Sequence, residues 1–338
     1  MAATPSLDSS IHLPVTSVET KHEILRHLWD FDVCPSHFYD IYHDYDAYFS
    51  YYTEQCSDAL HDGGRHVSVR THNDIVQIAQ HLKNSVNRNS VRQILGYELP
   101  LPKPANEDEL LDGSIDLVAR LLLMVEFGCL QYGFTGRRQV GWVEGSLGEC
   151  MTKYFGAPQI LEQETVRFEK VFNARNLGQI AGIKIRWTNN LADHLRLVDD
   201  VSIDANFSSN LFPVGLVDET LRTLALLFPG TDKTTKKWFK KLSTSKKLDT
   251  KAVKCGRLRA EDRYIENFEF WHDRLIVLKQ LFDEAEPDTF PRWWYDRRRR
   301  VQWYTFWIAA LVLVLTIFFG IVQSIEGGLQ VYKAYNPS

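Results

Sequence analysis

A long apolar run without charged residues lies near the C-terminal end of the chain. No charged residue occurs over 301–325, a run of 25 residues whose centre is rich in Leu, Ile, Val and Phe. A helix of that length spans about 37 Å, which exceeds the roughly 30 Å hydrocarbon core of a bilayer. The sequence therefore predicts one transmembrane helix over 301–325.

The residues that flank this run predict its orientation. Four consecutive arginines precede it: Arg297, Arg298, Arg299 and Arg300. Only Lys333 follows it, and an excess of Arg and Lys marks the cytoplasmic side of a membrane helix. The first five residues have neither the basic nor the apolar region of a signal peptide. We expect a tail-anchored protein of an intracellular membrane, such as the endoplasmic reticulum, with its N-terminal domain in the cytosol.

Helical spacing dominates the part of the chain before the arginines. Apolar residues three and four positions apart predict helices over about 21–30, 159–174, 218–227 and 268–282. Two capping boxes mark further helix starts, at Thr71 with Asp74 and at Ser146 with Glu149. Ser114 is expected to cap a strongly apolar core helix that follows it.

Short stretches of alternating polarity predict a few strands. Over 183–188, apolar residues alternate with polar ones, as in a half-buried strand. Further short strands are expected at 67–69, 136–143 and 201–203. The predicted fold class is α+β: a mainly helical cytosolic domain with a few short strands, plus one C-terminal transmembrane helix.

The chain divides into six expected segments. Its hydrophobic content of 44% and charged content of 24% are ordinary for a globular protein, so the part before the anchor is expected to fold. The segments are a flexible arm over 1–20, a cytosolic α+β region over 21–230 with a possible sub-boundary at 99–113, a basic linker over 231–262, an amphipathic juxtamembrane helix with a basic and aromatic collar over 263–300, the transmembrane helix over 301–325, and a short lumenal tail over 326–338.

The net charge of −4 conceals a strongly basic stretch. Residues 233–259 contain eleven Lys or Arg and one acidic residue, which gives the stretch a charge of 11 − 1 = +10. Such a run is commonly a solvated spacer. A second interpretation is a membrane surface segment, in which lysines meet anionic lipid headgroups while aromatic side chains reach the headgroup level. The residues concerned are Lys236, Lys237, Trp238, Phe239, Lys240 and Lys241.

Candidate chemistry is sparse. Nine of the eleven histidines lie between His12 and His81, so a metal site is most readily sought there. The densest group of potential metal ligands is His37, Asp40, His43 and Asp44. Imidazole and carboxylate groups suit Zn²⁺ or another divalent ion, but the spacing matches no defined motif, and polar surface residues are the simpler interpretation. No nucleophile elbow, phosphate loop or dinucleotide fingerprint occurs, and we expect no cofactor.

Small residues recur every four positions along the predicted transmembrane helix. They are Thr316, Gly320, Ser324 and Gly328. Small residues at this spacing allow close approach of helices in lipid, which favours self-association or association with a partner helix. Glycine is frequent in membrane helices in any case, so a chance occurrence is the alternative.

Five stretches of the chain carry a resemblance. They are 121–124 (LLLM), 130–134 (LQYGF), 183–197 (IKIRWTNNLADHLRL), 221–229 (LRTLALLFP) and, most strongly, 293–332 (WWYDRRRRVQWYTFWIAALVLVLTIFFGIVQSIEGGLQVY). Together they resemble a family of uncharacterised fungal single-pass membrane proteins, over most of 115–335. The resemblance implies membrane placement and one fold along the chain. Because that family has no assigned activity, it implies no catalytic residues.

Two functions follow as hypotheses. The first is a non-enzymatic protein-interaction or scaffold module held at an intracellular membrane, with lipids and a protein partner or a second copy as its contacts. The second is a membrane-bound accessory enzyme of a lipid or secondary-metabolite pathway, suggested by the histidine-rich region. A CorA-like transporter subunit is disfavoured because the chain has one span and lacks a G-M-N loop. A further hypothesis is nucleic-acid binding through the basic stretch. A membrane anchor argues against a nuclear role, though not against RNA binding at a membrane surface, and we do not expect nucleic acid as a partner.

Overall fold

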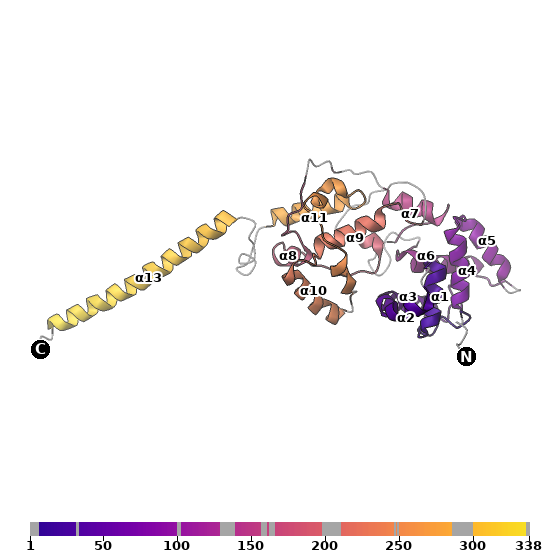
Figure 1. Cartoon of the computed structure of the whole chain (residues 1–338), viewed down its shortest axis with the longest axis horizontal. Coiled ribbons are helices and arrows are strands. Elements are labelled where there is room, and N and C mark those ends of the chain that lie inside the picture. The colour runs from indigo at the N-terminus through magenta and orange to yellow at the C-terminus, as the bar shows by residue number, and fades with distance from the viewer. Residues whose placement is uncertain are drawn as a thin grey trace.

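The computed structural model consists of a helical body and one long helix that projects from it (Figure 1). It describes residues 7–31, 34–99, 103–128, 139–156, 161, 166–197, 211–246, 248, 250–285 and 300–335. Within these ranges the only β-type pairings are three isolated bridges, so the expected strands at 67–69 and 183–188 are wrong. The same holds for 139–143, whereas 136–138 and 201–203 lie outside the described residues. The fold is therefore mainly helical rather than α+β.

The N-terminal half of the body packs around one central helix, α6 (Glu107–Leu123). Helices α3, α4 and α5 all contact α6, and α1 lies against α4. The surrounding helices are α1 (Val18–Trp29), α2 (Pro35–Ile41), η1 (Tyr42–Tyr45), α3 (Asp46–Leu60), α4 (His72–Lys83) and α5 (Arg88–Glu98). Ile115, Leu117, Val118 and Leu121 of α6 are completely buried, as expected of a helix that is enclosed on most sides.

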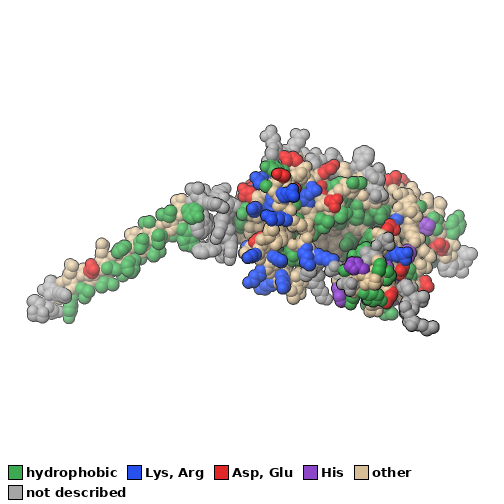
Figure 2. Space-filling model, in the orientation of Figure 1, with side chains coloured by type: hydrophobic (Ala, Val, Ile, Leu, Met, Phe, Trp, Pro, Cys, Tyr) green, Lys and Arg blue, Asp and Glu red, His purple; other side chains and the backbone are tan. Residues whose placement is uncertain are grey.

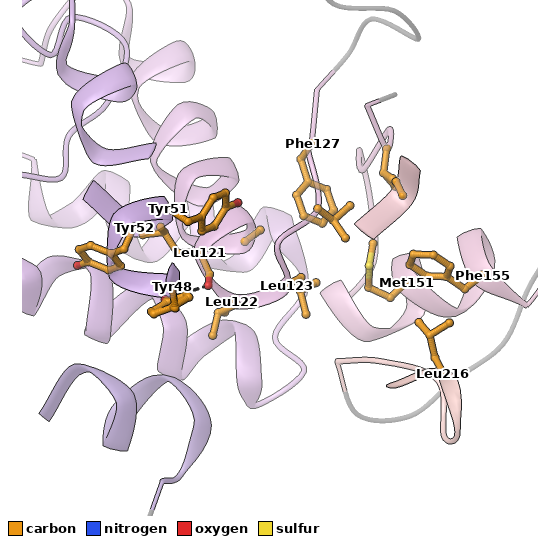
Figure 3. Packing of buried hydrophobic residues seen from close by; sticks show 14 of the residues in the cluster. Tyr48, Tyr51, Tyr52, Leu121, Leu122, Leu123, Phe127, Met151, Phe155 and Leu216 are labelled. Carbon is orange, nitrogen blue, oxygen red and sulfur yellow. Dashed lines mark hydrogen bonds between the residues drawn. The ribbon is translucent and has the colours of Figure 1, made fainter. Parts of the chain in front are cut away.

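The C-terminal end of α6 is closed by aromatic side chains from distant parts of the chain. Trp29, Tyr48 and Tyr51 donate hydrogen bonds to the carbonyl oxygens of 120–122, each at 3.1 Å. Met124 adopts a left-handed backbone conformation and closes the last turn through its N–H. Because the last four carbonyls of a helix lack partners within the helix, these bonds give partners to the carbonyls of Leu121 and Leu122 and a second partner to that of Arg120. Figure 3 shows the tyrosines beside this end of α6.

Helix α6 begins eight residues earlier than expected, and Ser114 lies inside it rather than capping it. The hydroxyl of Ser114 donates to the carbonyl of Leu110 and accepts the N–H of Ser68, at 2.7 and 2.8 Å. Gly113 lies against the segment that contains His66, where a Cβ would stand 2.0 Å from the His66 carbonyl oxygen. The glycine is therefore required by a close approach of two backbone segments.

The C-terminal half of the body is built from shorter elements. They are α7 (Leu147–Phe155), α8 (Ala174–Gln179), η2 (Leu191–Asp193), α9 (Leu216–Leu227), α10 (Lys233–Lys246), η3 (Thr250–Lys254), η4 (Glu261–Arg263), η5 (Ile265–Asn267) and α11 (His272–Glu284). The buried carboxylate of Glu219 in α9 accepts the backbone N–H groups of 269–271, at 2.8 to 3.2 Å, and so holds the start of α11. Burial raises the pKa of Glu219, and the three N–H bonds oppose that rise.

Several local predictions are confirmed. Both capping boxes are present, with each hydroxyl and carboxylate exchanging bonds with the backbone at the start of α4 and of α7. Helices α1, α9 and α11 also occupy the regions where apolar spacing placed helices. The helix expected over 159–174 is wrong in its described part, since residues 166–173 are not helical and α8 begins at Ala174.

The segment expected to be a basic linker belongs to the folded body. It forms α10 and η3, and α10 contacts α8 and η3 while η3 contacts α9. The side chain of Phe239 is only 2% exposed and belongs to the same core as the rest of the body. In its described part, the expected basic linker over 231–262 therefore contains a helix and short 3₁₀ segments.

Candidate membrane interface

The last helix, α13, runs over Arg300–Tyr335 and is 36 residues long. Its stretch Tyr304–Tyr332 has the length and apolar composition of a membrane span, and none of its most apolar window is buried by the rest of the protein. Apolar side chains are exposed all around it, such as Leu311 at 60% and Phe318 at 58%. Because no polar face exists, the helix suits a surrounding of lipid rather than the surface of a protein in water. The prediction of a C-terminal helix long and apolar enough to cross a membrane is confirmed, and its insertion into a membrane stays a prediction.

The four arginines mark the entry to α13. Arg300 is its first residue, whereas Arg297, Arg298 and Arg299 lie outside the described residues. Their cytoplasmic placement stays a prediction from the sequence. A helix of 36 residues is about 54 Å long, so α13 extends beyond a hydrocarbon core of about 30 Å.

One face of α13 carries small residues. A Cβ added at Gly320 or Gly328 would meet no heavy atom within 4 Å, so that face is open. The hydroxyl of Thr316 donates to the carbonyl of Val312 at 2.8 Å and needs no partner from outside the helix. With Ser324 these residues form an accessible strip, and association through it stays a prediction.

Helix α10 is amphipathic, and its apolar side faces the body. Asp232 caps it by accepting the backbone N–H groups of Thr234 and Thr235, at 3.1 and 3.2 Å. Thr235, Phe239 and Ser243 are buried, four residues apart along one side of the helix. The ring of Phe239 lies 5.1 Å from that of Phe228. Local capping and core packing together fix the rotation of α10 about its axis.

The lysines of α10 occupy its opposite side. Lys236, Lys237, Lys240 and Lys241 are exposed, and Lys233 extends the same side toward the N-terminus of the helix. Figure 2 shows Lys and Arg side chains gathered over the α10 end of the body. The expected surface position of the lysines is thus observed, whereas that of Phe239 is wrong and Trp238 is half-buried against the core.

The structure describes only part of the candidate metal site. His37 and Asp40 belong to α2 and His43 and Asp44 to η1, but the side chains of both aspartates lie outside the described residues. His37 is exposed, and Nδ1 of His43 lies 3.0 Å from a carboxylate oxygen of Asp46. No group of three His, Cys, Asp or Glu side chains in the described ranges has a metal-binding arrangement.

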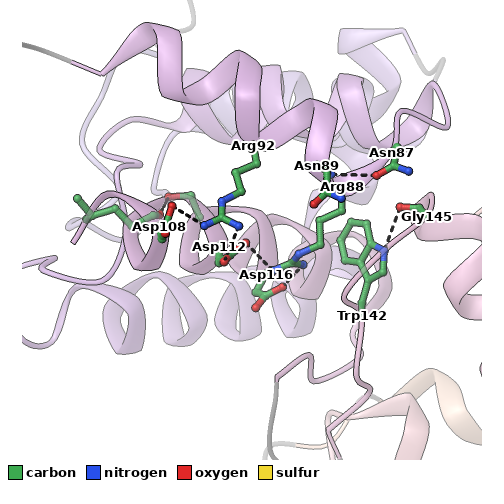
Figure 4. A network of polar contacts seen from close by, with 11 residues as sticks. Asn87, Arg88, Asn89, Arg92, Asp108, Asp112, Asp116, Trp142 and Gly145 are labelled. Atoms are coloured by element: carbon green, nitrogen blue, oxygen red, sulfur yellow. Dashed lines mark hydrogen bonds and ion pairs between the residues drawn. The ribbon is translucent and has the colours of Figure 1, made fainter. Parts of the chain in front are cut away.

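A charged network between α5 and α6 was missed from the sequence (Figure 4). It pairs Arg88 and Arg92 with three aspartates spaced by four residues on α6: Asp108, Asp112 and Asp116. The shortest contact of Arg88 is 2.6 Å, and its guanidinium lies 4.8 Å from the Trp142 ring centroid. The sequence did contain a signal for this network: Arg88 and Arg92 are four residues apart on α5, and the three aspartates are four residues apart on α6, the next helix in the chain. Because every carboxylate has an arginine partner, the network serves to join the two helices.

One buried histidine, His72, and one half-buried histidine, His194, are likewise engaged in the fold. Burial lowers the pKa of His72 to about 4, and its Nδ1 lies 2.8 Å from the hydroxyl of Tyr52. Burial, with a smaller contribution from Arg274, lowers the pKa of His194 to about 3. Both side chains are therefore neutral near pH 7.

Comparison with known proteins found no match. Neither a protein family, nor a curated protein, nor a solved structure resembles the chain closely enough to be significant. The family resemblance drawn from the sequence stays a prediction.

Proposed function

We propose that this chain is a tail-anchored, single-pass membrane protein whose helical body is a protein-interaction or scaffold module on the cytosolic face of an intracellular membrane, such as the endoplasmic reticulum. The observation that supports it is the contrast between α13, whose apolar side chains are exposed on every side, and the body, whose apolar side chains share one core. A body held at a membrane raises the local concentration of whatever it binds.

Membrane placement is tested by alkaline extraction of cell membranes. The full chain should stay in the membrane pellet, and a variant that lacks residues 300–335 should be released. For orientation, Asn206, which lies in an N-x-S sequon outside the described residues, should carry no glycan, whereas a sequon appended after Ser338 should be modified. Glycosylation of Asn206 in intact cells would reverse the proposed orientation.

The interaction module is tested by chemical crosslinking in membranes. Partners that bind the body should be recovered when α13 is exchanged for an unrelated membrane helix, because the body is unchanged. They should be lost from α13 expressed alone at the same level. If the exchange of α13 abolishes every crosslink, the binding resides in the membrane helix and the proposed role of the body is wrong.

A further inference from the structure

We propose that the lysine face of α10 is an electrostatic docking surface for anionic lipid headgroups of the same membrane that holds α13. The face comprises Lys233, Lys236, Lys237, Lys240 and Lys241, all of them exposed. The inference rests on the proposed membrane placement and adds how the body lies on that membrane.

The geometry of α10 produces a single charged strip. Its five lysines follow steps of three, one, three and one residues, so they share one side of a helix with 3.6 residues per turn. The side that contains Phe239 and Thr235 is buried in the body. The contact therefore consists of lysine ammonium groups, and no aromatic side chain is available for insertion.

Among the described residues, no acidic side chain neutralises the lysines of the strip. No carboxylate in the described ranges forms an ion pair with any of these five lysines, and the carboxylate nearest in sequence, Asp232, is bound to the hydroxyls and N–H groups of Thr234 and Thr235. Like charges at i,i+4, such as Lys236 with Lys240, destabilise a helix. A surface that supplies negative charge relieves this repulsion.

The position of α10 favours lipid as that surface. Helix α10 lies at the end of the body from which the chain leaves toward α13 (Figure 1). Residues 286–299 connect Ala285 with Arg300, so the fully extended chain spans at most about 54 Å between them. The tether keeps the strip near the bilayer, where even a low intrinsic affinity suffices for docking.

Charge beyond α10 enlarges the basic surface. Lys254, Arg257 and Arg259 are exposed in the segment that follows, which begins with η3 packed against α10. Single-stranded nucleic acid is a poorer fit, because such sites combine positive charge with exposed aromatic rings on which bases stack. On α10 the two aromatic side chains, Trp238 and Phe239, are half-buried and buried.

The test is a lysine acetylation footprint of the full chain in lipid nanodiscs. One set of discs contains phosphatidylcholine alone and the other about one third phosphatidylserine, and mass spectrometry gives the rate at each lysine. Because each lysine near an anionic surface strengthens binding by a factor of about five, we expect acetylation of the strip to slow at least threefold in the anionic discs. The protection should disappear at about 0.5 M salt, where charges are screened. Lys103 and Lys153 should react equally in both discs.

Two variants with equal changes in charge provide the control. In the first, the strip is neutralised: Lys236→Gln, Lys237→Gln, Lys240→Gln and Lys241→Gln. In the second, four exposed cations elsewhere are neutralised: Arg65→Gln, Lys103→Gln, Lys153→Gln and Lys170→Gln. Lys and Gln have similar helix propensity, so α10 should keep its fold. Lys233, which remains in both, should lose its protection only in the first variant.

The outcomes separate this inference from the proposed function. Equal acetylation in both kinds of disc, while α13 stays inserted, would overturn docking and leave the membrane anchor intact. Acetylation of the strip that is slower than that of Lys103 and Lys153 to the same extent in both kinds of disc would also overturn electrostatic docking, because the body would then rest on the bilayer without using charge. Protection by added RNA in neutral discs, with none from anionic lipid, would assign the strip to nucleic acid instead.

Discussion

Helix α10 and helix α13 both contain aromatic and aliphatic side chains, but they direct them oppositely. In α10 the apolar side chains point into the body, with Phe239 buried against Phe228, and the lysines face outward. In α13 the apolar side chains point outward on every side, as at Leu311 and Phe318. The difference shows that an apolar residue within a basic run indicates membrane insertion only when no protein core is available to it.

The largest effect is expected from charges placed in α13. Each arginine at the centre of a membrane helix costs about 2.5–3.5 kcal/mol, so Val312→Arg together with Leu315→Arg should prevent insertion. Alkaline extraction should then release the protein from membranes. The control is Val312→Ala with Leu315→Ala, which should remain inserted. If the arginine variant stays in the pellet, α13 is not surrounded by lipid.

The second prediction concerns Phe239, whose side chain distinguishes the two helices. Phe239→Ala should lower the free energy of unfolding of the body by about 3–5 kcal/mol, because it removes a fully buried ring and leaves a cavity. Denaturant unfolding in mild detergent, followed by tryptophan fluorescence, measures this loss. Lys240→Ala on the opposite side should change it by less than about 0.5 kcal/mol. Similar small effects of both changes would mean that α10 is not packed as described.

Substitutions at two glycines compare a position enclosed in the body, Gly113, with a position on the open surface of α13, Gly320. Gly113→Ala should destabilise the body by about 1–3 kcal/mol, because the added Cβ would stand 2.0 Å from the His66 carbonyl oxygen. Gly320→Ala should leave insertion and helix content unchanged, because no atom lies within 4 Å of its Cβ position. Thermal unfolding monitored by circular dichroism compares the two. A neutral Gly113→Ala would contradict the close approach of α6 to the His66 segment.

Acidification should lower the stability of the body and leave the helical structure of α13 unchanged. The pKa of His72 is lowered to about 4 by burial, below its ordinary value of 6.5. The unfolded chain therefore binds a proton there at a higher pH than the folded chain, and stability falls as the pH drops from about 6.5 toward 4. The urea midpoint of the body should decline over this range. The decline should be smaller in His72→Gln, while the helical signal of α13 persists.

The smallest effect is expected at the open face of α13. Gly320→Leu should weaken self-association or partner association, because a large side chain prevents close approach of helices. Crosslinking of the protein in membranes at several expression levels measures the association. Leu311→Ile provides a control of conserved volume. An unchanged crosslinking pattern would leave the small residues without a role in association.

Local signals in the sequence predicted much of the helical body. Thr71 with Asp74 and Ser146 with Glu149 mark helix starts through bonds made within three residues, so no tertiary information was needed. The transmembrane span was equally local, since length and missing charge suffice to define it. These features depend on residues that are close together in the chain, so they can be read from the sequence without knowledge of the fold.

The errors arose where a partner is distant in the sequence. The alternation of apolar and polar residues over 183–188 indicates which side chains are half-buried, but it does not indicate whether another strand lies beside this segment. The lysine run around Phe239 does not reveal that Phe228 and Trp187 lie within reach of the ring. Nor does the sequence show that the hydroxyls of Tyr48 and Tyr51 bond to carbonyls some 70 residues away. The exposed lysine strip follows from that same tertiary packing.

The closure of α6 by Trp29, Tyr48 and Tyr51 has a consequence for local opening of the body. The three donors lie on α1 and α3, 93, 73 and 69 residues from the carbonyls they bind. The last turn of α6 cannot lose these bonds unless α1 and α3 move away, and such a movement would leave the carbonyls of Leu121 and Leu122 without these partners. The backbone amides of these three helices should consequently exchange with deuterium at a common free energy, as one cooperative unit, although long stretches of chain separate them.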